Sequence, residues 1–132
     1  MELKGCTAIV TGGSGGLGQV ICRALAENGV NVVVNYAESE AKAQGVVDDL
    51  LKLGVRAMAL RADVADPAAV MWMVELAKAE FGRIDILVND AAFNKEVPFA
   101  DLDGLTHELW NHILNTNLTG SFNCIKAVAP LM

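Results

Sequence analysis

The chain has 132 residues, of which 53% are hydrophobic, and its formal net charge is −6. This length and composition allow one domain to bury a core, which excludes a disordered chain. The negative charge comes without a cluster of Lys and Arg, so nucleic acid and anionic membranes are poor partners, although backbone N–H groups can still bind a small anion.

Two long uncharged stretches, residues 5–22 and 109–125, do not predict membrane helices. Glycines interrupt the first stretch and asparagines interrupt the second, and neither residue type suits a lipid-facing helix there. The first residues are not followed by the apolar segment of a signal peptide. The three cysteines, Cys6, Cys22 and Cys124, are scattered and odd in number, as is typical of buried thiols in a reducing compartment. We therefore expect a cytoplasmic protein.

Four predicted strands alternate with four predicted helices. The strands are short and rich in β-branched and apolar residues, and they cover residues 6–10, 30–35, 56–62 and 84–89. The residues expected to begin or end the helices are Leu17, Gly29, Ser39, Gly54, Asp66, Pro67, Gly82 and Thr106. A loop over residues 90–105 precedes the last helix.

Strands that are separated by helices pair in parallel and are buried on both faces. With right-handed crossovers, the pattern predicts a doubly wound, Rossmann-like α/β sheet in the strand order 3-2-1-4. We expect one domain over residues 1–132. The apolar faces predicted for the second, third and last helices consist of Ala43, Val46, Val47, Leu50 and Leu51; of Val70, Met73, Val74, Ala77 and Phe81; and of Trp110, Ile113, Leu114, Leu118, Phe122 and Ile125. Trp72 and Trp110 are expected to be packing residues.

The stretch from Thr11 to Gly18 joins the first strand to the first helix, which is the setting of a phosphate-binding loop. Gly12 allows the chain to leave the strand in a conformation that a Cβ would hinder. Gly16 leaves room for a pyrophosphate, and Gly18 allows the helix to pack close to the strand. The helix N-terminus then offers N–H groups to the anion. The alternative is a glycine-rich turn that binds no ligand.

The spacing Thr-Gly-x-x-x-Gly-x-Gly in residues 11–18 resembles the glycine motif of the short-chain dehydrogenase/reductase family. Three later stretches resemble that family's motifs in the same order: Asp63-Val64, Asn89-Asp90-Ala91-Ala92 and Asn117-Leu118-Thr119-Gly120. The stretch Asn35-Tyr36-Ala37 resembles the 3-oxoacyl carrier-protein reductase type in particular. The resemblance implies an NAD(P)-dependent oxidoreductase that transfers hydride between nicotinamide and an alcohol or ketone.

The resemblance also implies a set of cofactor-binding residues. They are Gly12, Ser14, Gly15, Gly16, Leu17, Gly18, Asn35, Tyr36, Asp63, Val64, Asn89, Ala91 and Ala92. In the family, Asp63 would accept a hydrogen bond from the adenine amine and Val64 would pack on the ring. The alternative for Asp63 is an ordinary turn or capping residue.

Asn117 is the one catalytic residue that the resemblance places in this chain, where it would interrupt the last helix and hold a water. The surrounding residues are weak helix formers, which agrees with an interruption. Alternatively, Gly120 only allows a close helix crossing. Asp90 and Ala92 depart from the family's Asn and Gly, and Ala92 places a methyl group where φ is expected to be positive.

The sequence leaves both NAD and NADP open as cofactors. A diol-binding acid is expected about 20 residues after the glycine loop, yet the second strand ends in neutral Asn35 and Glu38 lies in the following loop. The position where family members carry an NADP-binding cation is Gly15. The likeness of residues 35–37 to the carrier-protein reductases favours NADP.

The family's Tyr-x-x-x-Lys is absent, because the only tyrosine, Tyr36, is followed four residues later by Glu40. We therefore expect the N-terminal part of a longer reductase, inactive alone because it lacks a proton donor. An exposed fourth strand would favour a homo-oligomer. The alternatives are a non-catalytic dinucleotide-binding module and an inactive product without a ligand. His107 and His112 lie too far apart around a helix to bind one metal ion.

Overall fold

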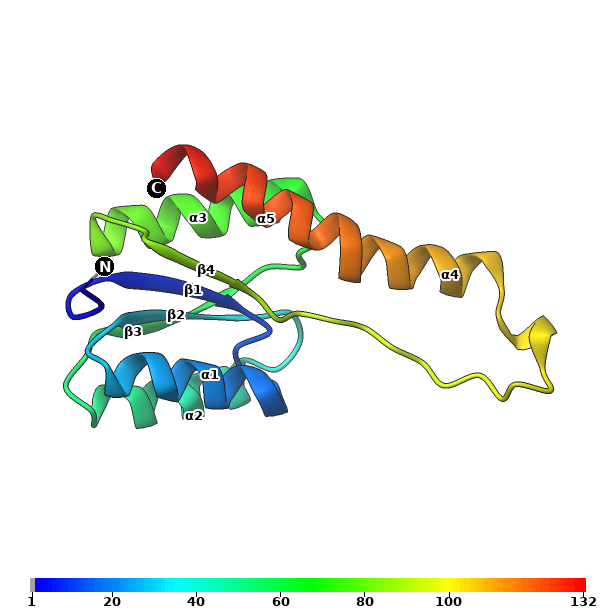
Figure 1. The fold of residues 1–132 in the computed structure, drawn as a ribbon, viewed down its shortest axis with the longest axis horizontal. Helices are drawn as coiled ribbons and strands as arrows, with labels where there is room; N and C mark the ends of the chain where they lie inside the picture. The colour runs from blue at the N-terminus through cyan, green and yellow to red at the C-terminus, as the bar shows by residue number, and fades with distance from the viewer. Residues whose placement is uncertain (1) are drawn as a thin grey trace.

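The computed structural model describes residues 2–132, and it consists of a parallel four-stranded sheet in the order β3-β2-β1-β4 with helices on both faces (Figure 1). The predicted doubly wound architecture and strand order are confirmed. The elements are β1 (Thr7–Thr11), α1 (Gly16–Glu27), β2 (Asn31–Tyr36), α2 (Glu40–Leu51), β3 (Ala57–Arg61), α3 (Pro67–Phe81), β4 (Ile86–Asn89), η1 (Leu102–Gly104), α4 (His107–Leu114), η2 (Asn115–Thr119), α5 (Gly120–Val128) and η3 (Ala129–Leu131).

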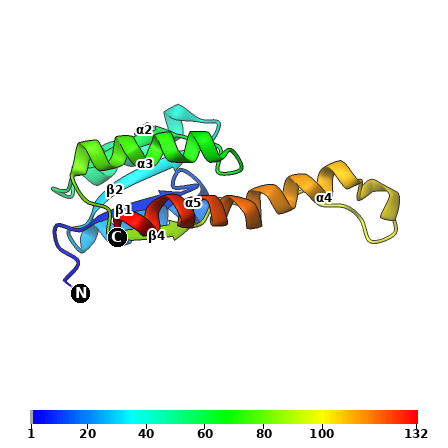
Figure 2. The same ribbon diagram turned by 90° about the horizontal axis from the view of Figure 1, so that it is seen from above.

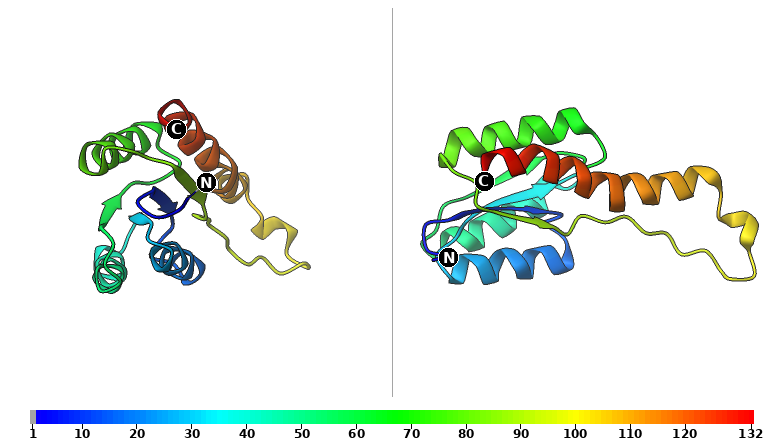
Figure 3. Two further views of the ribbon diagram at one scale, coloured as in Figure 1. Left: turned by 60° about the vertical axis from the view of Figure 1, so that its left-hand side comes forward. Right: turned by 45° about the horizontal axis from the view of Figure 1, so that its top comes forward.

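The sheet is buried on both faces because neighbouring strand residues point into different cores. Ile9 and Val33 belong to a core with α3 and α5, whereas Val10, Val32 and Val34 belong to a core with α1 and α2. Figure 3 shows these two helix layers on opposite sides of the sheet. Period-two alternation between two apolar layers explains why the strands read as continuous apolar runs.

The predicted starts of three helices are confirmed by side-chain caps. Ser39 Oγ accepts a hydrogen bond from Lys42 N, Asp66 Oδ1 accepts from Ala68 N, and Thr106 Oγ1 accepts from Leu109 N. Each bond satisfies an N–H group that has no partner inside its own helix. At the other end of α3, Gly82 adopts φ 78°, the left-handed conformation expected of a glycine that ends a helix.

The strands run in register, so that their carboxyl ends meet at one edge of the sheet. Thr11 of β1 pairs with Asn89 of β4, and Tyr36 of β2 pairs with Arg61 of β3. The loops that follow β1, β2, β3 and β4 therefore all leave the sheet at this edge, which is where open α/β sheets bind ligands.

The helix α4 and the loop before it project beyond the sheet as an arm (Figures 1 and 2). The apolar face predicted for the last helix is wrong for most of its residues. Trp110, Leu118, Phe122 and Ile125 are more than half exposed. The buried side of α5 consists instead of Gly120, Asn123, Cys124, Ala127 and Val128. Small residues allow α5 to approach α3 and the sheet, and the large apolar residues lie on the other side.

Two smaller predictions of burial are also wrong. Leu51, at the end of α2, is 49% exposed, because the helix presents only Ala43, Val47 and Leu50 fully to the core. Trp72 and Trp110 are each 53% exposed, so neither is a core packing residue within residues 2–132. Within that same range, no helix is long and apolar enough to span a bilayer.

Candidate functional site

The glycine loop between β1 and α1 is folded so tightly that two of its glycines admit no side chain. Gly12 has φ 63°, and a Cβ there would lie 2.9 Å from Ala91 Cα. A Cβ on Gly18 would lie 2.1 Å from Gly12 O. The two predicted reasons for glycine are confirmed: Gly12 has a backbone conformation that a Cβ would hinder, and Gly18 allows a close approach of the helix.

Gly16 differs from these two glycines because a Cβ there would meet nothing within 4 Å. It is the first residue of α1, and it is exposed. The missing side chain therefore leaves open space in front of the helix rather than room for a packing contact. This is the environment expected where a ligand approaches the backbone.

The N-terminus of α1 has no capping side chain among the described residues, unlike those of α2, α3 and α4. In this part of the chain, the N–H groups of Gly16, Leu17 and Gly18 donate no hydrogen bond to the protein. Free N–H groups and the positive end of the helix dipole both favour an anion at this position.

Thr11 fastens the turn after β4 to the glycine loop. Its Oγ1 accepts hydrogen bonds from Asp90 N at 3.0 Å and from Ala91 N at 3.1 Å, and it donates to Val88 O at 3.4 Å. The hydroxyl group thus uses its donor and both acceptor positions. Through these bonds β1 fixes the place where the chain leaves β4.

A cavity of about 600 Å³ opens at the carboxyl edge of the sheet. The predicted site residues that line it are Gly12, Ser14, Gly15, Leu17, Asn35, Tyr36, Asp63, Val64, Ala91 and Ala92. They come from the loops after all four strands, so the topology brings together residues that are distant in sequence. Three predicted cofactor-binding residues, Gly16, Gly18 and Asn89, lie outside this lining.

The Asp63-Val64 pair is held in place by α5. Asn123 Nδ2 donates a hydrogen bond to Val64 O at 2.9 Å, and a Cβ on Gly120 would lie 2.5 Å from Val64 Cγ2. Gly120 therefore allows a close approach, as the alternative interpretation held, but its neighbour is the loop after β3. Asp63 Oδ1 accepts a hydrogen bond from Ala65 N at 2.9 Å, so this carboxylate also serves as a turn residue.

Asn117 lies in the π-helical turn η2, and the predicted interruption of the last helix is confirmed. It does not line the cavity itself. Its Oδ1 accepts from Phe93 N at 2.7 Å, and its Nδ2 donates to Phe93 O at 3.0 Å. The Phe93 ring stacks on His112 with the ring centroids 3.9 Å apart. Asn117 thereby fixes the loop after β4 to the π-helical turn η2, and Phe93 and His112 form part of the cavity wall.

The two departures from the family motif have distinct consequences. Asp90 lines the cavity, and its charge adds to the effect of burial in raising the pKa of the Cys22 thiol to about 12. Ala92 does not have the positive φ that was expected, since no residue other than glycine has one in residues 2–132. Alanine therefore fits the backbone at this position without strain.

Several cavity residues were missed by the sequence analysis. Lys42, Ser39, Phe93, His112 and Thr116 all line the cavity. Lys42 had a detectable signal, since it lies three residues after the cap of α2 and the first turn of that helix follows the end of β2. Phe93, His112 and Thr116 had no such signal, because they meet only through the packing of the arm.

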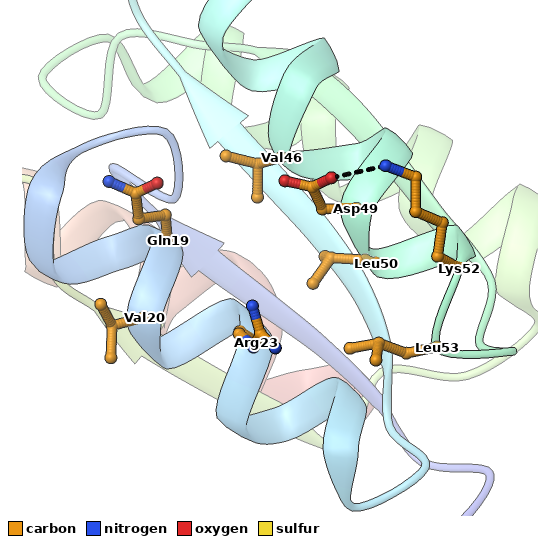
Figure 4. A pocket seen from close by; sticks show the side chains of 8 residues that line it. All are labelled: Gln19, Val20, Arg23, Val46, Asp49, Leu50, Lys52 and Leu53. Carbon is orange, nitrogen blue, oxygen red and sulfur yellow. Dashed lines mark hydrogen bonds and ion pairs between the residues drawn. The ribbon is translucent and has the colours of Figure 1, made fainter.

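A second hollow of about 440 Å³ lies between α1 and α2 (Figure 4). It is lined by Val20, Val46, Leu50 and Leu53 beside charged side chains, and none of the predicted site residues contributes to it. Its cations are paired, Lys52 with Asp49 and Arg23 with Glu27. The described part of the chain also contains no group of three or more His, Cys, Asp or Glu residues that could hold a metal ion. The cavity at the carboxyl edge is therefore the candidate site.

The sequence of residues 6–132 matches the family described as short chain dehydrogenase. The chain belongs to this family. A 3-oxoacyl-[acyl-carrier-protein] reductase, FabG, of Staphylococcus epidermidis is 41% identical over 126 residues, which cover 96% of this chain and 50% of that protein. A 3-oxoacyl-[acyl-carrier-protein] reductase of Synechocystis is 40% identical, with 95% of this chain and 49% of that protein covered.

Solved structures of the family agree with the fold. A short chain dehydrogenase of Burkholderia cenocepacia, in complex with NADP, superposes with a TM-score of 0.92 at 39% identity, covering 100% of this chain and 53% of that chain. A blue fluorescent protein from a metagenomic library, in complex with NADPH, has a TM-score of 0.90 at 36% identity, with 100% and 53% covered. The chain thus spans about half the length of the relatives that it matches.

Proposed function

We propose that this chain is the dinucleotide-binding part of an NAD(P)-dependent oxidoreductase that acts on an alcohol or ketone. The observation that carries the proposal is the cavity at the carboxyl edge of the sheet, into which the uncapped N-terminus of α1 leads. The proposal is supported by the 41% sequence identity to a carrier-protein reductase and by the likeness to structures solved with NADP and NADPH.

The described residues fit the cofactor because free N–H groups and open space occur together at Gly16. Ser14, Gly15, Gly16 and Leu17 would hold the pyrophosphate, and the adenine would lie against Asp63 and Val64. We place the nicotinamide-side ribose near Asn89, Ala91 and Ala92. When bound, the nicotinamide supplies or accepts a hydride at an alcohol or ketone carbon.

NADP is the favoured cofactor. Lys42 provides a cation in the cavity beside the loop after β2, where the second phosphate of NADP needs one, even though Gly15 carries no charge. Arg61 lies close by, since its Nε donates to Ala37 O at 3.0 Å. Glu38 also lines this part of the cavity and opposes a phosphate, so the preference over NAD is expected to be moderate.

The residues of this chain would hold the cofactor, but they do not include the Tyr-x-x-x-Lys that would supply the proton in the family. Asn117 holds the loop that carries Ala91 and Ala92 through its two bonds to Phe93. Tyr36 is buried, and Glu40 stands where a Tyr-x-x-x-Lys motif would need its lysine. We therefore expect the 132-residue chain alone to bind cofactor without reducing a ketone at the rate of an enzyme.

Fluorescence titration with NADPH tests the proposal directly. Wild-type chain is expected to bind at micromolar concentration, and Gly16→Asp is expected to abolish binding by placing a carboxylate in the open space. Gly45→Asp is the matched control, because Gly45 is exposed in α2, a Cβ there would also meet nothing within 4 Å, and the residue does not line the cavity. Absence of NADPH and NADH binding at millimolar concentration would refute the proposal, as would full binding by Gly16→Asp. Ketone turnover by the chain alone would refute only its expected inactivity.

We also propose that the chain self-associates and resides in the cytoplasm as one domain. The edge strand β4 and the apolar residues Trp110, Leu118 and Phe122 are all accessible in residues 2–132, and such surfaces favour association. The buried free thiols Cys6, Cys22 and Cys124 suit a reducing compartment. Sedimentation velocity tests the first point, because a monomer at high concentration would contradict it.

A further inference from the structure

Asn35 occupies the end of β2, the position at which dinucleotide-binding folds commonly place an acid that binds the ribose diol. Here the residue is only 2% exposed, and its side chain is engaged within the protein. Its Oδ1 accepts a hydrogen bond from Gly12 N at 3.1 Å, and its Nδ2 donates to Ala62 O at 3.1 Å and to Leu60 O at 3.3 Å. The side chain therefore bridges the exit of β1 to the exit of β3.

The main chain of Asn35 adds a further bond to the glycine loop, since Gly13 N donates to Asn35 O at 2.9 Å. Two consecutive N–H groups of the loop, those of Gly12 and Gly13, are thus both held by Asn35. Gly12 in turn contacts the two neighbours that shape the loop, Gly18 of α1 and Ala91 after β4. A shift of Gly12 would therefore move the N-terminus of α1 relative to the cavity.

This arrangement requires an amide. One end of the side chain must accept from an N–H group, while the other end must donate to carbonyl oxygens, and the neutral amide of Asn offers both on one planar group. A carboxylate could keep the bond from Gly12 N, but its second oxygen would face Ala62 O and Leu60 O without a proton to share. An apolar residue would leave all three main-chain groups without this partner.

We infer that Asn35 is a positioning residue, which sets the shape of the glycine loop and thereby the affinity for a pyrophosphate, and that it does not read the ribose. This inference rests on the proposed dinucleotide binding. It replaces the sequence-based interpretation of Asn35 as a cofactor contact. It also implies that Asn35→Asp weakens binding of both dinucleotides instead of creating a preference for NAD.

The experiment compares wild type, Asn35→Asp and Asn31→Ala by titration with NADPH, NADH, ADP and 2′-AMP. Asn31 is the matched control because it lies at the opposite end of β2, where its Oδ1 accepts from Arg56 N at 3.0 Å. Asn35→Asp is expected to weaken binding of NADPH, NADH and ADP by about tenfold, the effect of losing one well-placed contact. It should change 2′-AMP binding, which needs no pyrophosphate site, by no more than about threefold. Asn31→Ala should change none of the four.

A purely structural role would lower the folded fraction of Asn35→Asp without changing the ratio of ADP affinity to 2′-AMP affinity. An unchanged ratio would therefore overturn the inference, as would a gain of NADH affinity over NADPH affinity. If Asn35→Asp does not fold, amide NMR of the ligand-free wild type decides. The side-chain NH2 of Asn35 is expected to exchange slowly with solvent, and rapid exchange would overturn the inference. Failure of wild type to bind any dinucleotide would instead contradict the proposed function, which separates the two outcomes.

Discussion

Gly16 and Gly18 lie two residues apart at the start of α1, yet the structure predicts opposite effects of replacing each with alanine. The new methyl group of Gly18→Ala would lie 2.1 Å from Gly12 O, 2.8 Å from Gly12 C and 2.9 Å from Gly13 Cα. All three atoms belong to the backbone, so no side chain can rotate away. The methyl group of Gly16→Ala would meet no atom within 4 Å.

These distances decide the sign of the stability change. Overpacking of a rigid site costs about 1–3 kcal/mol, and for a domain of this size each kcal/mol lowers the Tm by about 3–5 °C. Gly18→Ala is therefore expected to lower the Tm by about 3–15 °C. Gly16→Ala reduces the freedom of the unfolded chain at no steric cost, and it is expected to raise stability by a few tenths of a kcal/mol up to about 1 kcal/mol.

The effect of Gly16→Ala on NADPH binding should be opposite in sign to its effect on stability. The methyl group of Gly16→Ala occupies the space that the proposed pyrophosphate needs, so the Kd for NADPH is expected to rise by about tenfold or more, although the protein is more stable. Thermal unfolding monitored by circular dichroism and NADPH titration measure the two effects on the same samples. An unchanged Tm in Gly18→Ala, or wild-type NADPH affinity in Gly16→Ala, would refute the reasoning.

Three further predictions concern charge and thiol chemistry. Lys42→Met is expected to weaken NADPH binding by about tenfold in a titration while leaving NADH binding unchanged. Equal loss of affinity for both cofactors would contradict the role of Lys42 at the second phosphate. The pKa of Asp85 is held below its ordinary value of 3.8, chiefly by hydrogen bonding from Arg83, so its stabilisation is complete above that pH and is lost as the pH falls through the lowered pKa. The free energy of unfolding, measured in urea, should accordingly fall less steeply below pH 4 in Asp85→Asn than in wild type. The same pH dependence in both proteins would contradict this. The Cys22 and Cys124 thiols, with pKa values raised to about 12 and about 11 by burial, should react with a disulfide reagent at pH 8 only on unfolding, as followed by absorbance.

The helix starts could be predicted from the sequence because their signals are local. Ser39, Asp66 and Thr106 each cap the helix that begins at the next residue, and the bond that does so spans three residues or fewer. Helical connections between apolar strands predicted a doubly wound sheet, and the order 3-2-1-4 is the Rossmann-like one among the doubly wound orders. The glycine loop could be predicted because its glycine spacing is local, although Ala91, which leaves no room for a Cβ on Gly12, follows β4.

The burial of the last helix could not be predicted in the same way. Helical spacing identified Trp110, Leu118 and Phe122 as one apolar face, but spacing does not show which surface covers that face. The contact that α5 makes is set by Gly120, which lies against Val64 from a different part of the chain. Small residues carry little hydrophobic signal, so a close approach of this kind is visible only in three dimensions.

Asn35 shows that the location of a residue can be predicted from the sequence when its hydrogen-bond partners cannot. The sequence placed it at the end of β2 and beside the glycine loop, and both statements hold. Whether its amide faces the cavity or the protein depends on the carbonyl groups of Leu60 and Ala62, which come from the next strand. No pattern within residues 30–40 indicates those partners, so the sequence alone does not distinguish a cofactor contact from the proposed positioning role.

Gly12 is the point at which the separate parts of the candidate site are coupled. Its N–H donates a hydrogen bond to Asn35 Oδ1 of β2. Its carbonyl oxygen leaves no room for a Cβ on Gly18 of α1, and Ala91 after β4 leaves no room for a Cβ on Gly12 itself. Ala91 is itself fixed by Thr11, and the loop that follows it is fixed by Asn117. A disturbance at any of these contacts must therefore reach the N-terminus of α1 through one residue with almost no free space. Substitutions far apart in the sequence, at Asn35 and Gly18, should consequently be non-additive in their effect on pyrophosphate binding, whereas Lys42, which touches none of these contacts, should combine additively with either.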